Sequence, residues 1–422
     1  MKMLSRLTSM VLCLCMMFCI LVSCDKKTEN NVKTKKGTIS ADKYGLQVDE
    51  NGVILLNGEP FYGMGVNWHG AFASGTLPKQ YGSIGFDMAL YFKPLKDNGV
   101  PFIRIQMGTH YKEEVAKYDK EPDKYFAAMD EVVAAAEKFN VGIIGSLMWN
   151  LSSIPGYVGE TIEALKDPNS ESMVLAAQYV RDVVKRYKDS PAIWAWEIGN
   201  EGNLGCDLGA QGGFLTTEIL NKYYELIGSV IKENDPNRLI TGGDSEPRGS
   251  SKALRETGTW APVDTYEDTK ETIGLYTPSP LNCISMHMYQ EDKTTIRDFK
   301  TIIGDYVKMA KELKIAYFVG EFGAGSMTFA NEMDQKGPED PREALEQECW
   351  KALKDAILEN DVQLSAAWCY RRDEQATDPT SIVPNLQNEH MWKGIVESNA
   401  KYISEGKNKA AEYWAGVTPL FN

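Results

Sequence analysis

The chain has 422 residues, of which 43% are hydrophobic and 25% charged, a composition typical of a folded globular protein. Its formal net charge is -14, from 45 basic and 59 acidic side chains, which disfavours nucleic acid as a partner because nucleic-acid-binding surfaces are basic. Only four histidines are present. Four histidines provide few ligands for a histidine-rich metal centre, and we expect neither a metal nor another cofactor.

The first 23 residues have the pattern of an export signal. A basic start precedes an apolar run over residues 10–22, which is too short for a membrane-spanning helix. Residues 21–24 resemble a bacterial lipobox, in which Cys24 would become the lipidated first residue. An ordinary signal peptide with a chance cysteine is the alternative. We therefore predict a lipid-anchored protein of the bacterial outer membrane, on its periplasmic or surface side, with the lipid as its sole membrane contact.

Residues 24–40 are polar and rich in lysine, which predicts a flexible tether ahead of one folded domain over residues 41–422. The first 38 residues carry seven basic and two acidic side chains, so the domain is more acidic than the whole chain. Such a charge repels polyanionic substrates and not neutral ones. The domain's cysteines allow three disulfide pairings, but we expect free buried thiols because a domain of this size needs no crosslinks. They are Cys206, Cys283, Cys349 and Cys369.

The domain begins with a β-hairpin pattern and continues with alternating strands and helices. The apolar runs 46–48 and 53–56 flank Asn51-Gly52, a dipeptide that favours hairpin turns. Eight further apolar runs predict strands at 61–67, 102–107, 141–149, 193–200, 239–243, 283–289, 317–321 and 364–368. Amphipathic patterns predict helices at 86–98, 123–139, 171–188, 215–233, 294–313, 343–359 and 390–404, with a short helical piece at 252–256.

This alternation predicts a (β/α)8 TIM barrel with an N-terminal β-hairpin. An open doubly wound sheet is the alternative, and it is weakened because no glycine-rich phosphate-binding motif follows the first strand. In a barrel of this kind the chemistry takes place at the C-terminal ends of the strands. We therefore expect the site among the polar and aromatic residues that end the predicted strands.

Two glutamates follow the fourth and seventh predicted strands, which lie nearly opposite each other in an eight-stranded barrel. Glu201 follows the fourth strand and Glu321 ends the seventh, so their side chains can meet at the mouth of the barrel. Glycoside hydrolysis needs such a pair, one carboxyl to protonate the leaving oxygen and one to attack carbon or activate water. Either glutamate alone could equally cap a helix or pair with arginine. Glu197, which lies earlier in its strand, is expected to be a supporting group inside the barrel.

Motifs on successive strands resemble clan A glycoside hydrolases and are most similar to family 5, the cellulase and mannanase family. The matching segments are residues 56–61 with 63–67, Arg104, Asn200-Glu201, His287-Met288-Tyr289, Glu321-Phe322-Gly323 and Trp368. The resemblance spans roughly residues 44–405. It implies hydrolysis with retention of configuration, in which Glu201 is the acid/base and Glu321 the nucleophile.

The same resemblance implies a set of substrate-binding side chains. Arg104 and Tyr289 would keep Glu321 ionised through charge and hydrogen bonding. Asn200 would bind a sugar 2-hydroxyl, and His287 would orient the acid/base or a sugar hydroxyl. The family often ends its third strand with histidine, where this chain has Trp149 and Asn150. His69 or His110 could fill that place, although His110 is expected to be a surface or packing residue.

Tryptophans at strand ends are expected to stack on sugar rings. Trp68, Trp149 and Trp368 occupy such positions, and His69 and Asn150 lie beside them in the sequence. The other six are expected to have packing roles: Trp194, Trp196, Trp260, Trp350, Trp392 and Trp414.

Together these observations predict a monomeric β-glycoside hydrolase, of endo-β-mannanase or endo-β-glucanase type, acting on a neutral oligo- or polysaccharide. Two alternatives remain open. The first is a non-catalytic carbohydrate-binding lipoprotein on the same barrel. The second is a metal-dependent barrel hydrolase, against which the scarcity of histidine and the lack of a ligand cluster argue. Asp207, Glu332 and Asp334 could be metal ligands, but solvated acidic loops are the stronger explanation for them. Long loops at 202–213, 245–280 and 324–341 are expected to shape the cleft.

Overall fold

Eight parallel strands form a closed barrel, in the order β10-β11-β4-β5-β6-β7-β8-β9. The computed structural model describes residues 37–72, 87–208, 215–290, 295–324, 341–371, 380–385 and 388–421. The barrel strands are β4 (Gly63–Asn67), β5 (Phe102–Gln106), β6 (Gly142–Met148), β7 (Ile193–Gly199), β8 (Leu239–Thr241), β9 (Cys283–Tyr289), β10 (Ala316–Gly323) and β11 (Leu364–Ala367). Each coincides with a predicted strand, and the predicted fold class is confirmed.

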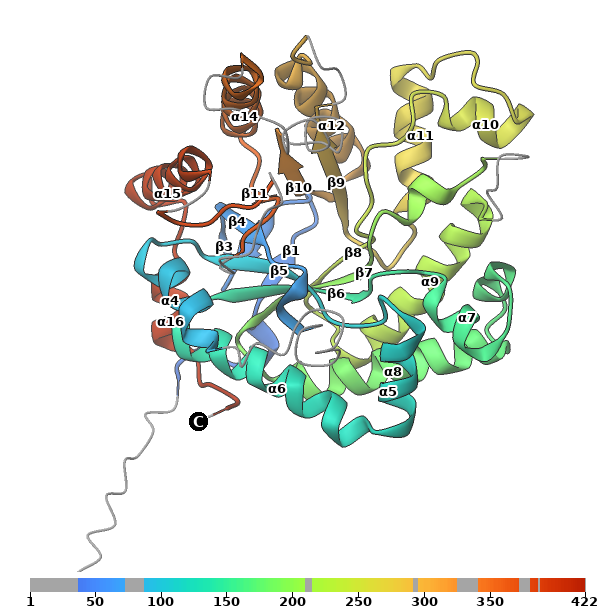
Figure 1. Cartoon of the computed structure of the whole chain (residues 1–422), viewed down its shortest axis with the longest axis horizontal. Coiled ribbons are helices and arrows are strands. Elements are labelled where there is room, and N and C mark those ends of the chain that lie inside the picture. The colour runs from blue at the N-terminus through green and yellow to red at the C-terminus, as the bar shows by residue number, and fades with distance from the viewer. Residues whose placement is uncertain are drawn as a thin grey trace, which may run out of the picture. The chain divides into compact units, whose positions relative to one another are not determined.

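Helices surround the barrel and pack their apolar faces on its outer side (Figure 1). Seven of them are α4 (Met88–Asp97), α6 (Pro122–Phe139), α8 (Glu171–Tyr187), α9 (Thr217–Asn234), α12 (Phe299–Leu313), α14 (Pro341–Glu359) and α15 (Glu389–Ser404). All seven overlap predicted helices. Side-chain caps explain where two of them begin: Ser170 accepts a hydrogen bond from the Met173 amide at 3.1 Å, and Thr216 accepts one from the Ile219 amide at 3.2 Å.

Further helical elements lie in the connections between strands and helices. They are η1 (Ala41–Lys43), α5 (Lys112–Lys120), α7 (Ser153–Val158), η2 (Ile162–Lys166), η3 (Gly202–Gly205), α10 (Ser251–Thr257), α11 (Tyr266–Tyr276) and α16 (Ala410–Gly416). Among these, only α10 coincides with a predicted helical piece.

The segment 245–280 corrects the prediction of a long loop, because it holds both α10 and α11. A reciprocal cap starts α11: the Thr265 hydroxyl accepts from the Asp268 amide at 3.3 Å, and the Asp268 carboxylate accepts from the Thr265 amide at 3.1 Å. The helix buries only three residues, which is too few to produce a regular apolar repeat in the sequence. The helix predicted from residue 294 also begins later, at Phe299, because Asp298 caps it.

A small antiparallel sheet closes the N-terminal end of the barrel, and it matches the predicted hairpin. Its strands are β1 (Leu46–Val48), β2 (Ile54–Leu56) and β3 (Glu59–Pro60). Apolar side chains from this sheet pack against the first residues of several barrel strands. Trp194 belongs to this cluster, is fully buried, and meets Phe61 edge-on with ring centroids 5.2 Å apart. The C-terminal ends of the strands lie away from this sheet and remain available for a site.

The cysteines, the search for a membrane-spanning helix and the N-terminal segment complete the comparison with the sequence-based predictions. The four cysteines of the domain are buried free thiols. Within the described residues, no helix combines the length and apolar character needed to cross a bilayer. The export segment 1–23, Cys24 and most of the tether lie outside those residues, as do Glu332 and Asp334.

Trp194 provides a test of the barrel floor. Replacing it with alanine removes its packing against Phe61 and leaves a cavity, so Trp194→Ala should lower the free energy of unfolding by about 3–5 kcal/mol in urea denaturation. Val174→Ala is the control, because Val174 lies on α8 and is 58% exposed; it should change that free energy by less than about 0.5 kcal/mol. Equal changes in the free energy of unfolding for the two substitutions would contradict a stabilising role of Trp194 in the barrel floor.

Candidate active site

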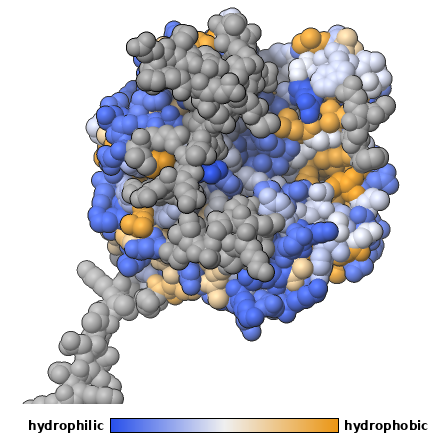
Figure 2. Space-filling model, viewed as in Figure 1, coloured by the Kyte–Doolittle hydropathy of each residue, from blue (hydrophilic) through white to orange (hydrophobic). Residues whose placement is uncertain are grey.

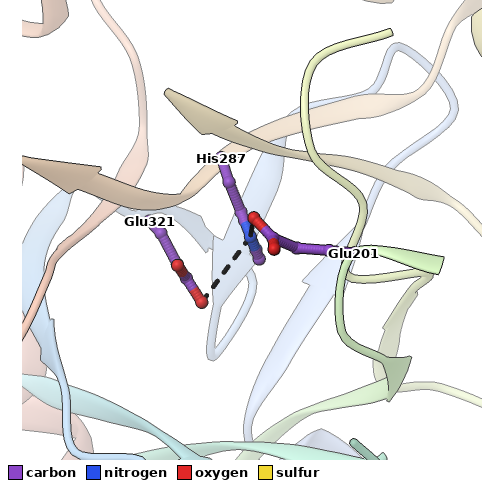
Figure 3. Close-up of side chains that lie close together, drawn as sticks. All are labelled: Glu201, His287 and Glu321. Atoms are coloured by element: carbon purple, nitrogen blue, oxygen red, sulfur yellow. Dashed lines mark hydrogen bonds and ion pairs between the residues drawn. The ribbon is translucent and has the colours of Figure 1, made fainter. Parts of the chain in front are cut away.

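Glu201 and Glu321 face each other at the C-terminal end of the barrel (Figure 3). Glu201 lies two residues after β7, and Glu321 lies near the end of β10. One carboxylate oxygen of each glutamate and one ring nitrogen of His287 all lie within 4.8 Å of one another. The Glu201 side chain is 32% exposed and that of Glu321 only 5%, so the pair consists of one solvent-accessible and one buried carboxyl.

A fully buried arginine on β5, Arg104, links four residues of the site. Its Nη1 donates to Glu321 Oε1 at 2.6 Å and to Asn67 Oδ1 at 2.9 Å. Its Nε donates to Glu197 at 2.8 Å, and its Nη2 donates to Asn200 Oδ1 at 2.8 Å. Burial alone would lower the pKa of Arg104, but the carboxylates of Glu197 and Glu321 raise it above its usual range. The guanidinium is therefore a permanent buried cation, balanced by two carboxylates.

Tyr289, at the end of β9, completes the surroundings of Glu321. Its hydroxyl donates to Glu321 Oε2 at 2.6 Å, while Arg104 occupies Oε1. Burial, and then the neighbouring Glu321, raises the pKa of Tyr289 well above its usual value, so the phenol keeps its proton and acts as a donor. Each oxygen of Glu321 thus accepts a hydrogen bond, an arrangement that suits the negative charge of a carboxylate.

Glu201 lies in a different environment, set by the turn on which it sits. Burial raises the pKa of its carboxyl, an effect that Arg104 opposes. Its backbone has φ 52° and ψ 30°, in the left-handed region that few residues other than glycine adopt. The Glu201 amide donates to Gly243 O at 2.7 Å. Gly243, with φ 82°, has no room for a side chain, since a Cβ there would lie 2.1 Å from Gly199 O.

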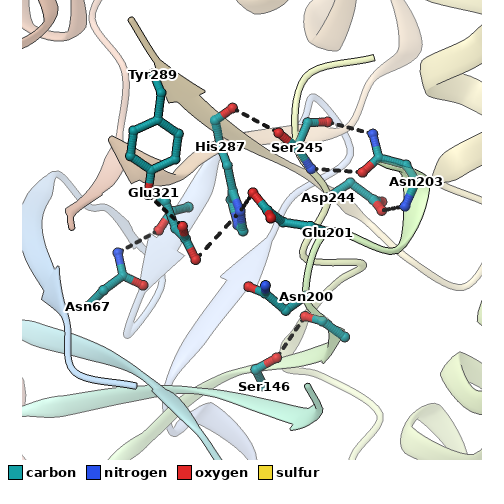
Figure 4. Close-up of polar contacts among 12 residues, drawn as sticks. Asn67, Ser146, Asn200, Glu201, Asn203, Asp244, Ser245, His287, Tyr289 and Glu321 are labelled. Atoms are coloured by element: carbon teal, nitrogen blue, oxygen red, sulfur yellow. Dashed lines mark hydrogen bonds and ion pairs between the residues drawn. The ribbon is translucent and has the colours of Figure 1, made fainter. Parts of the chain in front are cut away.

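A set of hydrogen bonds, here called the Asn203 clasp, joins the turn after β7 to the end of β8 (Figure 4). The Asn203 side chain donates to Ser245 O at 2.8 Å and accepts from Ser245 N at 3.0 Å. The carboxylate of Asp244 accepts from Asn203 N at 3.3 Å and from the Tyr224 hydroxyl at 2.9 Å. Burial is the main cause that raises the pKa of Asp244 to about 7. The clasp thereby fixes the backbone that carries Glu201.

His287, on β9, lies between the two carboxylates. Its Nδ1 is 3.0 Å from Glu201 Oε1 and 3.6 Å from Glu321 Oε1. Burial lowers the pKa of His287 to about 4, so the ring is neutral at pH 7. A neutral ring can donate to an ionised Glu201 or accept from a protonated one, depending on its tautomer. The contact therefore suits both protonation states of Glu201.

Three rings form a stacked wall beside Arg104. The rings of His69 and Trp368 lie 5.3 Å apart at 18°, and those of Trp149 and Trp368 lie 6.5 Å apart at 28°. The Arg104 guanidinium carbon lies 5.0 Å from the centre of the Trp149 ring. All three rings are partly exposed, so they offer flat apolar surface at the barrel mouth. His110, the other histidine considered for the third-strand position, also lies near Trp149, at 6.4 Å.

Two predictions about tryptophans are wrong. Trp68 is 4% exposed and stacks on Tyr91 of α4 at 4.2 Å, so it packs in the core and offers no face to a sugar. Neighbouring strand residues point to opposite sides, and the side chain of Asn67 takes the inward direction toward Arg104. Trp260, expected to have a packing role, is 51% exposed.

Asn150 is exposed, and its amide oxygen accepts hydrogen bonds from the Ser152 amide at 3.0 Å and the Ser152 hydroxyl at 2.8 Å. These bonds give Asn150 a local role in the turn before α7.

The sequence reasoning left several residues of the site without a role. Asn67 and Asp244 were recognisable as strand ends, and Asp244 follows two glycines, a sign of close backbone approach. Asn203, Ser245 and Tyr224 gave no signal, because their contacts exist only once β7, β8 and α9 have come together.

The carboxylates and His287 are near enough to bind a metal ion, but their surroundings do not favour one. The Arg104 guanidinium lies 2.6 Å from Glu321, and a fixed positive charge there repels a divalent cation. Asp207, considered as a ligand from the sequence, instead accepts from the Thr217 amide at 3.2 Å at the start of α9. We assign no metal to these residues.

An open cleft of about 750 Å³, here called the Glu201-side cleft, begins at this site. Glu201, His287 and Tyr289 line one end, whereas Glu321 and the stacked wall do not line it. Further along, its lining includes Glu246, Arg248, Asp264, Tyr266, Arg297 and Tyr306. The face seen in Figure 2 is hollowed near its centre, where hydrophilic residues lie.

The chain is similar to known families and proteins. A family profile described as Cellulase (glycosyl hydrolase family 5) matches residues 56–356. Mannan endo-1,4-beta-mannosidase F of Aspergillus fumigatus is 30% identical over 172 residues, which cover 39% of this chain and 36% of that protein. Putative mannan endo-1,4-beta-mannosidase 4 of Arabidopsis thaliana is 25% identical over 312 residues, 67% of this chain and 74% of that one. The chain spans only 24% to 36% of the length of the Aspergillus and Neosartorya mannosidases F that it matches.

Solved structures share the fold at low sequence identity. The endo-1,4-beta-mannanase from Rhizomucor miehei has a TM-score of 0.63 at 17% identity, over 85% of this chain and 99% of that one. The beta-mannanase from the blue mussel Mytilus edulis has a TM-score of 0.55 at 14% identity, over 85% and 97% of the two chains. At such identities the similarity establishes the common barrel.

The pKa of His287 can be tested directly, since the chain has only four histidines. We expect its ring resonances in ¹H–¹⁵N NMR to stay constant from pH 8 to 5.5 and to titrate near pH 4, because burial disfavours the charged ring. The unfolded chain takes up this proton near pH 6.5, so the related stability is complete above that pH and is lost as pH falls toward 4. His287→Gln assigns the signal, and a midpoint above pH 6 would contradict the proposed burial effect.

Proposed function

Because the chain belongs to the cellulase family, glycosyl hydrolase family 5, whose profile matches residues 56–356, we propose that it hydrolyses a neutral β-linked glycan with retention of configuration. The observation that carries this proposal is the pair formed by Glu201 and Glu321, whose nearest oxygens lie within 4.8 Å across the barrel mouth. Carboxyl groups about 5–5.5 Å apart are typical of retaining enzymes, whereas inverting enzymes leave about 6.5–9.5 Å for a water. The short separation supports retention.

In the proposed first step, Glu321 is the nucleophile. Its carboxylate attacks the anomeric carbon while the bond from that carbon to the glycosidic oxygen breaks, which gives a glycosyl ester on Glu321. Arg104 and Tyr289, each 2.6 Å from one of its oxygens, orient the carboxylate and hold it ionised until it reacts. Their two donors also leave the carboxylate little freedom to rotate.

Glu201 is the proposed general acid and then the general base. It delivers its proton to the leaving oxygen, and in the second step it takes a proton from the water whose oxygen attacks the anomeric carbon and frees Glu321. The raised pKa that burial gives Glu201 favours the protonated form that the first step needs. Its 32% exposure gives water access for the second step.

The substrate we propose is a β-mannan or β-glucan. The stacked wall of His69, Trp149 and Trp368 provides flat apolar faces for a pyranose ring, and we propose that Asn200, which Arg104 holds through its Oδ1, binds the sugar 2-hydroxyl. The net acidity of the chain suits a neutral glycan better than an anionic one. The relatives named as mannan endo-1,4-beta-mannosidases make β-1,4-mannan the first substrate to test.

Two substitutions distinguish the roles of the pair. Glu201→Gln should lower cleavage of mannan oligosaccharides by about 10²–10⁴-fold, because the general acid is lost. It should spare the first step on a dinitrophenyl glycoside, whose leaving group needs no proton. Glu321→Gln should abolish both reactions, because no glycosyl ester can form. Initial rates and the product anomer, followed by ¹H NMR, measure these effects.

Glu131→Gln, an exposed carboxyl on α6, is the matched control and should keep full activity. Turnover at the wild-type rate in both site variants, or an inverted first product, would overturn the mechanism. Binding of glycans without any cleavage by the unaltered protein would instead favour a carbohydrate-binding lipoprotein.

We also propose that Cys24 carries lipid and that the domain is attached through residues 25–40 to the bacterial outer membrane, on its periplasmic or surface side. The support is the export pattern of residues 1–23 and the lipobox resemblance of residues 21–24. In a bacterial host, the full chain should fractionate with membranes and incorporate labelled palmitate, whereas Cys24→Ser should do neither. Labelling of the Cys24→Ser chain would refute lipidation at this residue.

A further inference from the structure

We propose that the Glu201-side cleft binds the leaving-group part of the glycan and that Trp260, whose ring lies against the cleft residue Arg248, stacks on one of its sugar rings. This proposal rests on the proposed function and adds the direction in which the glycan lies across the site. It also assigns a binding role to a tryptophan outside the catalytic centre.

The direction follows from which carboxyl lines the cleft. A general acid gives its proton to the oxygen of the leaving group, so that part of the glycan extends away from the bond on the side of the acid. Glu201 lines the cleft, whereas Glu321, Trp149 and Trp368 do not. The retained sugar then lies on the stacked wall, and the leaving chain runs along the cleft toward α10 and α11.

Trp260 is connected to the cleft through Arg248. The guanidinium carbon of Arg248, a lining residue, lies 5.8 Å from the Trp260 ring centre. Hydrogen bonds fix the surrounding backbone: the Ser250 hydroxyl donates to Trp260 O at 2.9 Å, and Asp264 N donates to Gly249 O at 2.7 Å. The backbone around Trp260 is thus held, and its ring, beside the Arg248 guanidinium, is 51% exposed. An exposed tryptophan face offers a flat apolar surface on which a sugar ring can stack.

The chemistry of the cleft fits an uncharged, hydroxyl-rich chain. Glu246 and Arg297 neutralise each other through two hydrogen bonds of 2.8 and 3.0 Å. Arg297 also donates to the Tyr289 carbonyl at 2.9 Å, which ties this ion pair to the catalytic end of the cleft. The lining carries both acidic and basic side chains together with tyrosine hydroxyls, and these groups offer hydrogen bonds to sugar hydroxyls. The cleft volume of about 750 Å³ lies in the range of known ligand sites.

The test compares chain lengths and cleavage positions. Purified wild type, Trp260→Ala and Trp260→Phe are assayed on β-1,4-manno-oligosaccharides of three and six units, labelled at the reducing end. For Trp260→Ala, kcat/KM should fall about tenfold on the six-unit chain and by a clearly smaller factor on the three-unit chain, because the proposal lets only the longer leaving part reach Trp260. Cleavage of the six-unit chain should move toward its reducing end. Trp260→Phe should keep most of the wild-type kcat/KM on the six-unit chain and most of the wild-type cleavage pattern.

Val174→Ala, an exposed apolar residue on α8 outside the cleft, should behave as wild type on both chains. Equal losses on the two chain lengths, or an unchanged cleavage position in Trp260→Ala, would overturn the proposal. A Trp260→Ala protein that keeps its cleavage pattern but loses self-association, measured by sedimentation, or loses binding to phospholipid vesicles would also overturn it. Absence of cleavage by wild type on any glycan would instead reject the proposed function itself.

Discussion

The buried guanidinium of Arg104 is the interaction on which the site depends. A cation removed from water must be balanced by carboxylates and saturated with acceptors, and here Glu197 and Glu321 provide the charge while Asn67 and Asn200 provide further acceptors. These partners come from β4, β7, β10 and the turn after β7. One charge therefore sets the relative positions of strands that are far apart in the sequence. Removal of any partner would leave part of that charge uncompensated.

The two carboxyls differ because their supports differ. Glu321 is held within a strand by donors at both oxygens, whereas Glu201 sits on a turn fixed through backbone contacts and the Asn203 clasp. His287 lies between them as a neutral ring. A carboxyl held rigidly between two hydrogen-bond donors and a partly exposed one with a raised pKa are what two-step acetal chemistry demands of a pair. This contrast supports the division of roles proposed for them.

The sequence predicted the barrel because its strands and helices are local patterns with regular periods. Only part of the site could be predicted from the sequence. Arg104, His287 and Glu321 lie within barrel strands and Glu201 follows one, so their meeting at the barrel mouth could be expected from topology. The Asn203 clasp could not be predicted, since it depends on the distance between two turns. Trp68 was misjudged because strand-end position does not determine which way a ring points. Trp260 was misjudged because it lies in the connection between α10 and α11, where no regular pattern indicates which residues are buried.

The placement of α10 and α11 has a consequence for how such a protein can change over time. They are inserted between β8 and β9 and contribute no strand to the barrel, and none of the hydrogen bonds of Arg104 involves them. Insertions, deletions or replacements in this segment can therefore diversify what is recognised beyond the bond being broken, while the charged centre is inherited intact. Ligand preference and bond-breaking chemistry are in this sense modular within one barrel.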